Sequence, residues 1–225
     1  MKFQLIKALT VSLALFCLTP SVKASDALFG AVMSYCQDKG CKSGAFYYHF
    51  EKNIDRYCSG VKYVNSEVTQ SDKMAIIEQM VIDQGLPANI SLLPLVESGL
   101  DPDAVSSVGA VGIWQFMEET GIDMGLVINA NIDQRRDIKA STQAAIKYLH
   151  WLKKQFNGDL DLSIIAYNAG VGRVQKLIKE YGTDNPWLIA KGLLRGKEAE
   201  YYLARYYGYS LAMYAKGVCD ESDSL

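Results

Sequence analysis

Glu97 is the residue whose surroundings in the sequence most clearly suggest chemistry. The five residues before it, LLPLV, are apolar, and Gly99 and Leu100 follow shortly after. Desolvation disfavours the charged form of a carboxyl, so we expect the pKa of Glu97 to be raised. A carboxylic acid that is still protonated near neutral pH can donate a proton to a leaving group as a general acid. An equally open alternative is a structural carboxylate that caps a helix end or forms an ion pair.

Two further short motifs follow Glu97-Ser98 along the chain, GIWQ at 112–115 and AYN at 166–168. The elements that must position these motifs are predicted to be helices, because apolar residues recur at helical spacing and strand-like alternation is nearly absent. We expect helices from Ser71, over about 88–98, 112–118, 162–169 and 173–181, and over about 197–216. The fold class is therefore mainly α.

Acidic residues are the expected N-caps of two of these helices. Asp133 or Asp137 can open a long helix whose buried stripe runs from Ala144 to Leu152, and Asp161 is expected to cap the helix that carries the AYN motif.

Residues 1–24 read as a secretory signal peptide, because a basic start and an apolar core of residues 8–18 precede a small-residue cleavage site. We expect cleavage after Ala24 and a periplasmic protein, with peripheral attachment to the cell envelope left open. Without Lys2, Lys7 and Lys23 the chain keeps 20 basic and 25 acidic residues, a formal net charge of −5. This acidic balance, together with the lack of a Lys/Arg run, argues against nucleic acid as a partner.

Four cysteines remain after residue 24: Cys36, Cys41, Cys58 and Cys219. An even number in an exported chain predicts two disulfides, but the sequence does not decide among the three possible connectivities. A zinc site formed by Cys36, Cys41, His49 and Cys58 is the alternative, although this spacing fits no familiar zinc module.

The ordered motifs resemble those of the Slt-type lytic transglycosylases, lysozyme-like enzymes that cut peptidoglycan. Within that family the resemblance is greatest to the catalytic domain of the membrane-bound lytic murein transglycosylase D branch. It covers roughly residues 72–205 and rests on GLPANISLLPLVESGLDPDAVS, GAVGIWQFMEETG, AAIKYLHWLKKQF, IIAYNAGVGRV and KEAEYYL. It implies a lysozyme-like (goose-lysozyme or Slt-type) helical domain at 71–218. A small disulfide-pinned N-terminal extension at 25–70 precedes this domain, and a tail at 219–225 follows it.

The same resemblance implies that Glu97 is the only catalytic acid/base. It would cleave the bond between N-acetylmuramic acid and N-acetylglucosamine and leave a 1,6-anhydromuramoyl end, without a cofactor or a metal. The implied substrate is the peptidoglycan glycan strand. A partner from an envelope machine stays unknown.

The resemblance also implies that the remaining motif residues bind the substrate. They would contact the sugars through hydroxyl, amide or apolar groups, and Tyr167 would in addition hydrogen-bond Glu97, while Tyr202 would close the groove. The residues are Ser106, Gln115, Met117, Tyr167, Asn168 and Tyr202.

Two other functions are consistent with the sequence. One is a goose-lysozyme-like muramidase that hydrolyses the bond, since Asp101, Asp103 and Glu118 lie near the expected groove and could hold a water. The other is an inactive glycan-binding protein of the cell envelope.

Overall fold

The computed structural model describes residues 43–193, 198–214, 218 and 219, together with single residues at 30, 34 and 37. The expected signal peptide, Cys36, Cys41 and the tail beyond Cys219 lie outside the described residues. The helices are α2 (Ser43–Ser66), α3 (Val68–Asp83), η1 (Ala88–Leu92), α4 (Leu93–Ser98), α5 (Glu118–Met124), η2 (Gln134–Arg136), α6 (Ile138–Gln155), α7 (Leu160–Ala169), α8 (Val171–Tyr181), α9 (Pro186–Gly192) and α10 (Glu198–Tyr214). Over the described ranges only isolated β-bridges occur and no strand, which confirms the mainly α fold class.

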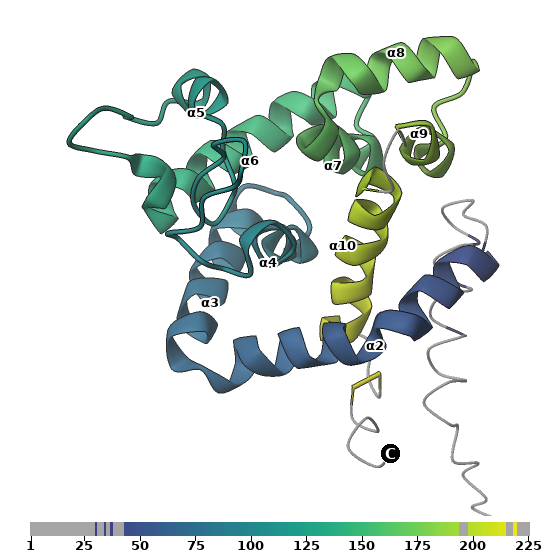
Figure 1. Cartoon of the computed structure of the whole chain (residues 1–225), viewed down its shortest axis with the longest axis horizontal. Coiled ribbons are helices and arrows are strands. Elements are labelled where there is room, and N and C mark those ends of the chain that lie inside the picture. Colours follow the sequence, from purple (N-terminus) through teal and green to yellow (C-terminus); the bar gives the residue numbers. More distant parts are fainter. Residues whose placement is uncertain are drawn as a thin grey trace, which may run out of the picture.

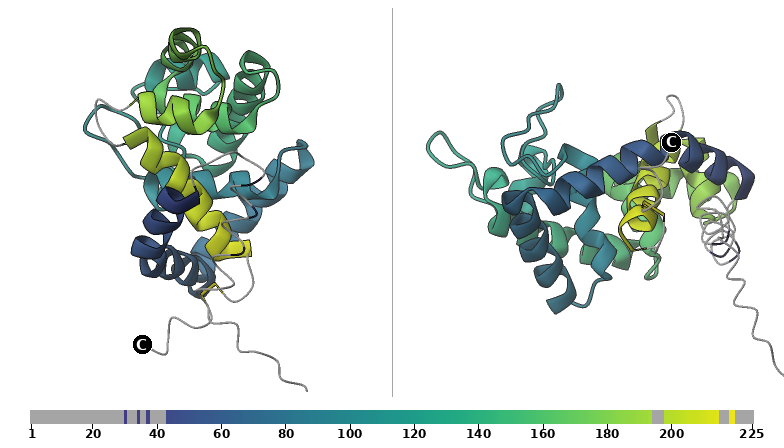
Figure 2. Two further views of the ribbon diagram at one scale, coloured as in Figure 1. Left: turned by 90° about the vertical axis from the view of Figure 1, so that its right-hand side faces the viewer. Right: turned by 90° about the horizontal axis from the view of Figure 1, so that it is seen from below.

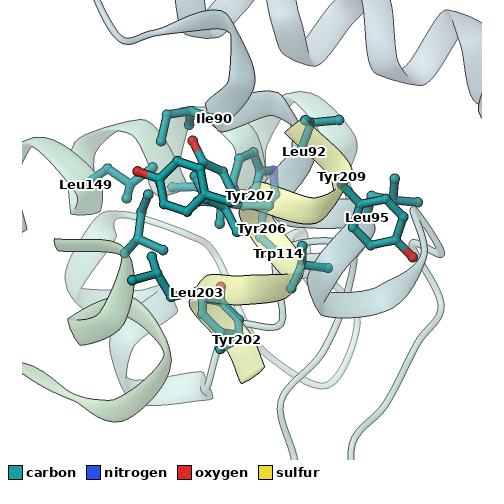
Figure 3. Close-up of a cluster of buried hydrophobic side chains, with 14 of the residues drawn as sticks. Ile90, Leu92, Leu95, Trp114, Leu149, Tyr202, Leu203, Tyr206, Tyr207 and Tyr209 are labelled. Atoms are coloured by element: carbon teal, nitrogen blue, oxygen red, sulfur yellow. The ribbon is translucent and has the colours of Figure 1, made fainter. Parts of the chain in front are cut away.

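Helix α10 runs through the middle of the molecule and is packed against elements from both ends of the chain (Figure 1). It contacts α2 and α4 on one side and α7 and α9 on the other. Its buried tyrosines and leucines meet side chains of η1, α4 and α6 in one apolar cluster, with Trp114 at its centre (Figure 3). The side chains on this buried face of α10, Tyr202 among them, are therefore held inside the core.

Helices α2 and α10 approach each other closely through two reciprocal glycine–tyrosine contacts. A Cβ on Gly208 would lie 2.6 Å from the ring of Tyr57, and a Cβ on Gly60 would lie 2.7 Å from the ring of Tyr209. Because the glycines have no side chain, the two rings can meet edge to face, with centroids 5.0 Å apart.

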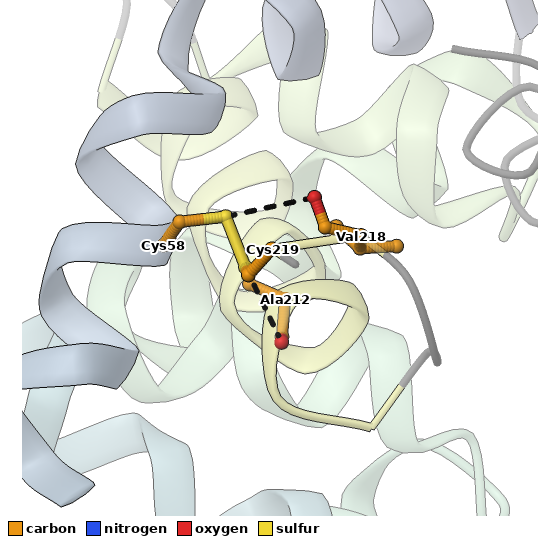
Figure 4. The surroundings of a disulfide bond; sticks show 4 residues. All are labelled: Cys58, Ala212, Val218 and Cys219. Atoms are coloured by element: carbon orange, nitrogen blue, oxygen red, sulfur yellow. Dashed lines mark hydrogen bonds between the residues drawn. A yellow bond between two sulfur atoms is a disulfide. The ribbon is translucent and has the colours of Figure 1, made fainter. Parts of the chain in front are cut away.

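A disulfide between Cys58 on α2 and Cys219, just beyond α10, fixes the same pair of elements (Figure 4). It joins residues 161 positions apart, and the two Cα atoms are 5.4 Å from each other. The expected disulfide-pinned N-terminal extension is confirmed for this cysteine pair. Since Cys58 is disulfide-bonded, it cannot serve as a zinc ligand, and the described residues contain no group of three potential metal ligands.

Of the two expected helix caps, one is confirmed and one is wrong. Asp137 caps α6 as expected, accepting a hydrogen bond from the Ala140 N–H at 2.7 Å. The cap of α7 is Asp159, however, whose side chain accepts from the Leu162 N–H. Asp161 was the wrong choice: it lies inside the helix, is buried and accepts a hydrogen bond from the Tyr207 hydroxyl on α10.

The expected helix at 112–118 is also wrong. These residues form turns joined by bridges between Val111 and Phe116, and α5 begins only at Glu118. Gly112 and Gln115 have positive φ angles of 83° and 51°, which a right-handed helix cannot contain. Figure 2 shows teal loops that extend from the helical body, whereas Ile113, Trp114 and Phe116 of the segment 112–118 are buried.

We predict that replacing both Cys58 and Cys219 with serine lowers the free energy of unfolding by about 2–4 kcal/mol, because the long cross-link then no longer restricts the unfolded chain. Urea denaturation of the oxidised protein and the double variant measures the difference. The variant should keep the circular dichroism spectrum of the parent, and an unchanged urea midpoint would contradict the prediction.

Candidate active site

Glu97 lies in the last turn of α4, the short helix that emerges from the core. Leu93, Pro94, Leu95 and Val96 are all buried, so the helix is held firmly on its apolar side. The helix ends one residue after Glu97, and the Glu97 residue as a whole is half-buried at the point where the chain leaves the core.

Tyr202 on α10 is the residue that contacts the Glu97 carboxyl. Its hydroxyl donates a hydrogen bond to Glu97 Oε1 at 2.5 Å, and its side chain is only 4% exposed. This is the one hydrogen bond of the Glu97 side chain among the described residues. We had expected such a bond from Tyr167, but that hydroxyl donates to the backbone carbonyl of Trp114 at 2.9 Å instead.

Arg205 lies one turn further along α10 and was missed in the sequence. Its Nη2 donates to the carbonyl oxygen of Val96 at 2.5 Å, directly beside Glu97. Its Nε is buried and has no hydrogen-bond partner within the described part of the chain. The available signal was its position three residues after Tyr202, which places both side chains on the same face of a helix.

Burial dominates the protonation behaviour of Glu97. Desolvation raises the pKa of its carboxyl to about 7, while the hydrogen bond from Tyr202 and the positive charge of Arg205 act in the opposite direction. Near neutral pH the protonated and ionised forms are therefore both populated. Such a group can give a proton away and take one back, as a general acid/base must.

The loop between α4 and α5 is held by Gly112 and Arg135. A Cβ on Gly112 would lie 1.9 Å from the carbonyl oxygen of Arg135, so only glycine fits against η2. The buried Arg135 side chain forms an ion pair with Asp133 at 2.8 Å and donates to the carbonyl oxygens of Gly109 and Phe116. The contacts of η2 with Gly109, Gly112 and Phe116 thus fix the backbone of the loop.

The side chains of Ser106 and Gln115 form some of their possible hydrogen bonds within this loop. The Ser106 hydroxyl accepts a hydrogen bond from the Ala110 N–H at 2.9 Å. The side-chain amide of Gln115 donates to the carbonyl oxygens of Gly112 and Ala104 at 2.8 and 3.4 Å. The hydroxyl hydrogen of Ser106 and the amide oxygen of Gln115 remain as the groups that could meet a ligand.

Met117 and Asn168 are on the surface of the protein. The Met117 side chain is 44% exposed and follows the buried Phe116, so it can form an apolar wall. Asn168 is exposed near the end of α7, and among the described residues the Glu97 side chain forms its hydrogen bond with Tyr202 and not with Asn168.

Tyr167 belongs to a group of aromatic rings that connects the motifs. Its ring centroid is 5.4 Å from that of Tyr148, 6.2 Å from that of Phe116 and 6.5 Å from that of Trp114. The Trp114 indole N–H in turn donates to the Thr142 hydroxyl on α6. The GIWQ and AYN motifs, more than 50 residues apart in the sequence, therefore meet on α6.

A family described as "Transglycosylase SLT domain" matches residues 74–190 of the chain. Membrane-bound lytic murein transglycosylase D of Escherichia coli (strain K12) is 41% identical over 125 residues, which are 55% of this chain and 28% of that protein. Membrane-bound lytic murein transglycosylase F of Desulfosudis oleivorans is 32% identical over 127 residues, 51% of this chain and 26% of that protein. The chain thus matches between a quarter and a third of the length of these relatives.

Among solved structures, an inactive mutant of the lytic transglycosylase Slt from Pseudomonas aeruginosa has a TM-score of 0.51 to this chain. The two are 19% identical, and the match covers 85% of this chain and 35% of that one. This likeness confirms the expected Slt-type fold. The residues that match the family end before α10, so Tyr202 and Arg205 reach Glu97 from outside the matched segment.

We predict that Tyr202→Phe raises the pKa of Glu97 further, because the variant loses the hydrogen bond that favours the carboxylate. Carbon-13 NMR titration of the Glu97 carboxyl measures the shift. Tyr167→Phe is the matched control, since the Tyr167 hydroxyl is bonded to Trp114. Equal shifts in the two variants, or a lowered pKa in Tyr202→Phe, would contradict this arrangement.

We also predict that Gly112→Ala lowers the free energy of unfolding by about 3 kcal/mol, since the new methyl group collides with the backbone of Arg135 in addition to the strain of a positive φ. Gly125→Ala is the control, because its φ of 101° is also positive but no atom lies within 4 Å of the added Cβ. It should cost only about 1–2 kcal/mol. Chemical denaturation compares the two, and equal losses would exclude the collision as the cause.

Proposed function

Because the chain belongs to the transglycosylase SLT domain family, we propose that it is a lytic murein transglycosylase, a lyase that acts on the glycan strands of peptidoglycan with Glu97 as its single acid/base. The observation that carries this proposal is the state of Glu97, whose carboxyl is desolvated to a pKa of about 7 and held by Tyr202. The names of the relatives in the transglycosylase D and F branches support the substrate class.

The reaction needs two proton transfers at the same carboxyl. Glu97 first gives its proton to the glycosidic oxygen between N-acetylmuramic acid and N-acetylglucosamine, and the C1–O bond breaks. The C6 hydroxyl of the muramoyl residue then bonds to C1, and its proton passes to the Glu97 carboxylate. The product is a 1,6-anhydromuramoyl end, no water is consumed, and the enzyme returns to its starting protonation state.

A single carboxyl is enough for this chemistry because the substrate supplies its own nucleophile. Glycosidases that use water, by contrast, pair the acid with a second carboxylate. Within the described part of the chain no second carboxylate contributes to the pKa of Glu97. Asp103 forms an ion pair with Arg136, and Asp101 accepts a hydrogen bond from the Asp103 N–H. These two carboxylates are engaged within the loop, and the third candidate, Glu118, is exposed at the start of α5. None of the three affects the pKa of Glu97, which supports ring closure over hydrolysis.

Tyr202 and Arg205 would serve the second half of the reaction. When Glu97 becomes a carboxylate, the Tyr202 hydroxyl already donates to it and the positive charge of Arg205 is close. Burial keeps the proton on Glu97 at the start, and these two groups limit the cost of removing it. Ser106, Gln115, Met117, Tyr167 and Asn168 would contact the sugars around the cleaved bond.

The expected export to the periplasm is consistent with this substrate. The described helices include none that is both long enough and apolar enough to cross a membrane. The names of the membrane-bound relatives support a location at the cell envelope, which we propose for this chain as well.

Digestion of purified murein sacculi in water enriched in oxygen-18, followed by mass spectrometry, tests the proposed reaction. We predict anhydromuropeptides without incorporated oxygen-18. Reducing ends that carry the label would show that the enzyme is a hydrolase. Sacculi that are bound but not digested would show a glycan-binding protein.

Glu97→Gln should reduce the release of muropeptides by about 10²–10⁴-fold or more, because an amide cannot donate the proton. Glu118→Gln is the control, since this carboxylate is exposed at the start of α5 and has no assigned part in the reaction. Its activity should remain within a few-fold of that of the parent. Comparable losses in the two variants would contradict the single acid.

A further inference from the structure

Two aromatic side chains on α6, Tyr148 and Trp151, form a stacked pair that the proposed reaction does not use. Their ring planes are 13° apart and their centroids 5.8 Å apart. Of the three tryptophans, Trp114 is fully buried and Trp187 is half-buried, whereas Trp151 is 39% exposed. No acceptor for the Trp151 indole N–H exists among the described residues. The packing of α6 in the core does not account for an exposed indole whose N–H has no acceptor.

The pair is continuous with the candidate active site. The ring centroid of Tyr148 is 5.4 Å from that of Tyr167, and the same ring stacks with Trp151. Tyr167 lies near the end of α7, which packs beside α6 (Figure 1). The charge of Glu97 contributes to the raised pKa of Tyr167, so Tyr167 lies in the surroundings of Glu97. The rings of Tyr167, Tyr148 and Trp151 therefore lead from these surroundings along α6.

The geometry of the stack leaves apolar ring surface uncovered. Aromatic carbons in contact are about 3.5–4.0 Å apart. A centroid separation of 5.8 Å between nearly parallel rings thus means that Tyr148 and Trp151 are offset. Tyr148 therefore covers only part of the Trp151 ring, and Trp151 is 39% exposed.

Such a surface matches one face of a pyranose ring. The C–H groups of a sugar can lie on an aromatic face, while its hydroxyl and acetamido groups point to the sides, where the indole N–H can donate to them. Neither aromatic side chain carries a charge, so the pair suits an uncharged, N-acetylated sugar better than an ionic group.

We infer that Trp151 and Tyr148 form an additional sugar subsite, which holds an N-acetylated sugar of the glycan strand at a distance from the bond that Glu97 cleaves. This inference rests on the proposed function, because it assigns the same substrate to a second position. It follows that affinity should increase when a glycan is long enough to reach from the neighbourhood of Tyr167 to Trp151.

Calorimetric titration of the Glu97→Gln protein with N-acetylglucosamine oligomers, from the dimer to the hexamer, tests the subsite without turnover. With Trp151 present, affinity should rise when the oligomer becomes long enough to reach α6. Trp151→Ala should weaken the binding of the long oligomers about tenfold, which corresponds to about 1.4 kcal/mol. The short oligomers should bind as before, and Trp151→Phe should keep most of the affinity for the long ones.

Tyr63→Ala is the matched control, because Tyr63 is also an exposed aromatic side chain (46%) but lies on α2, which α3 separates from α6. It should leave the binding of every oligomer unchanged. Circular dichroism of each variant confirms that the fold is kept.

Three outcomes would overturn the subsite: an equal loss at all oligomer lengths, no loss in Trp151→Ala, or no oligomer binding by the Glu97→Gln protein. The sacculus digestion separates this result from the proposed function. If anhydromuropeptides form while Trp151→Ala binds long oligomers like the parent, only the subsite is wrong. If sacculi are neither digested nor bound, both proposals fail.

Discussion

The contact between α4 and α10 is the constraint on which the arrangement around Glu97 depends. The apolar residues of α4 bring the carboxyl to the edge of the core, where desolvation raises its pKa to about 7. Tyr202 and Arg205 on α10 oppose this effect through a hydrogen bond and a positive charge. The balance leaves a carboxyl that can exist in either form near neutral pH. A small displacement of α10 would change that balance, because hydrogen bonds weaken steeply with distance and angle.

Helix α10 in turn depends on the part of the chain that precedes the family match. Helix α2 lies along it, with Tyr57 against Gly208 and Gly60 against Tyr209. The disulfide between Cys58 and Cys219 fixes the chain just beyond α10 to the same helix. The N-terminal extension is thus structurally linked to the residues that contact Glu97, although it contributes no side chain to that contact among those described.

Local rules predicted several elements well and failed where long-range contacts intervene. Asp137 caps α6 as its position in the sequence suggests. Aspartate is a common helix cap, but Asp161 lies in the core, where it accepts a hydrogen bond from the Tyr207 hydroxyl. Asp159 caps α7 instead. The segment 112–118 has helix-forming residues, yet the close approach of Gly112 to Arg135 and the positive φ of Gln115 hold it as a loop. In each case the partner lies on another element.

The sequence by itself determined the helical fold class and the apolar surroundings of Glu97, because these follow from the order and spacing of residues in short segments. Through the family resemblance it also predicted that Glu97 and Tyr202 belong to one site. Only the tertiary structure decided that Tyr202 and not Tyr167 donates to Glu97, that Arg205 lies beside it, and that Cys58 pairs with Cys219. The physical reason is that these contacts join residues more than 100 positions apart, and their geometry is set by how the helices pack and not by any local pattern.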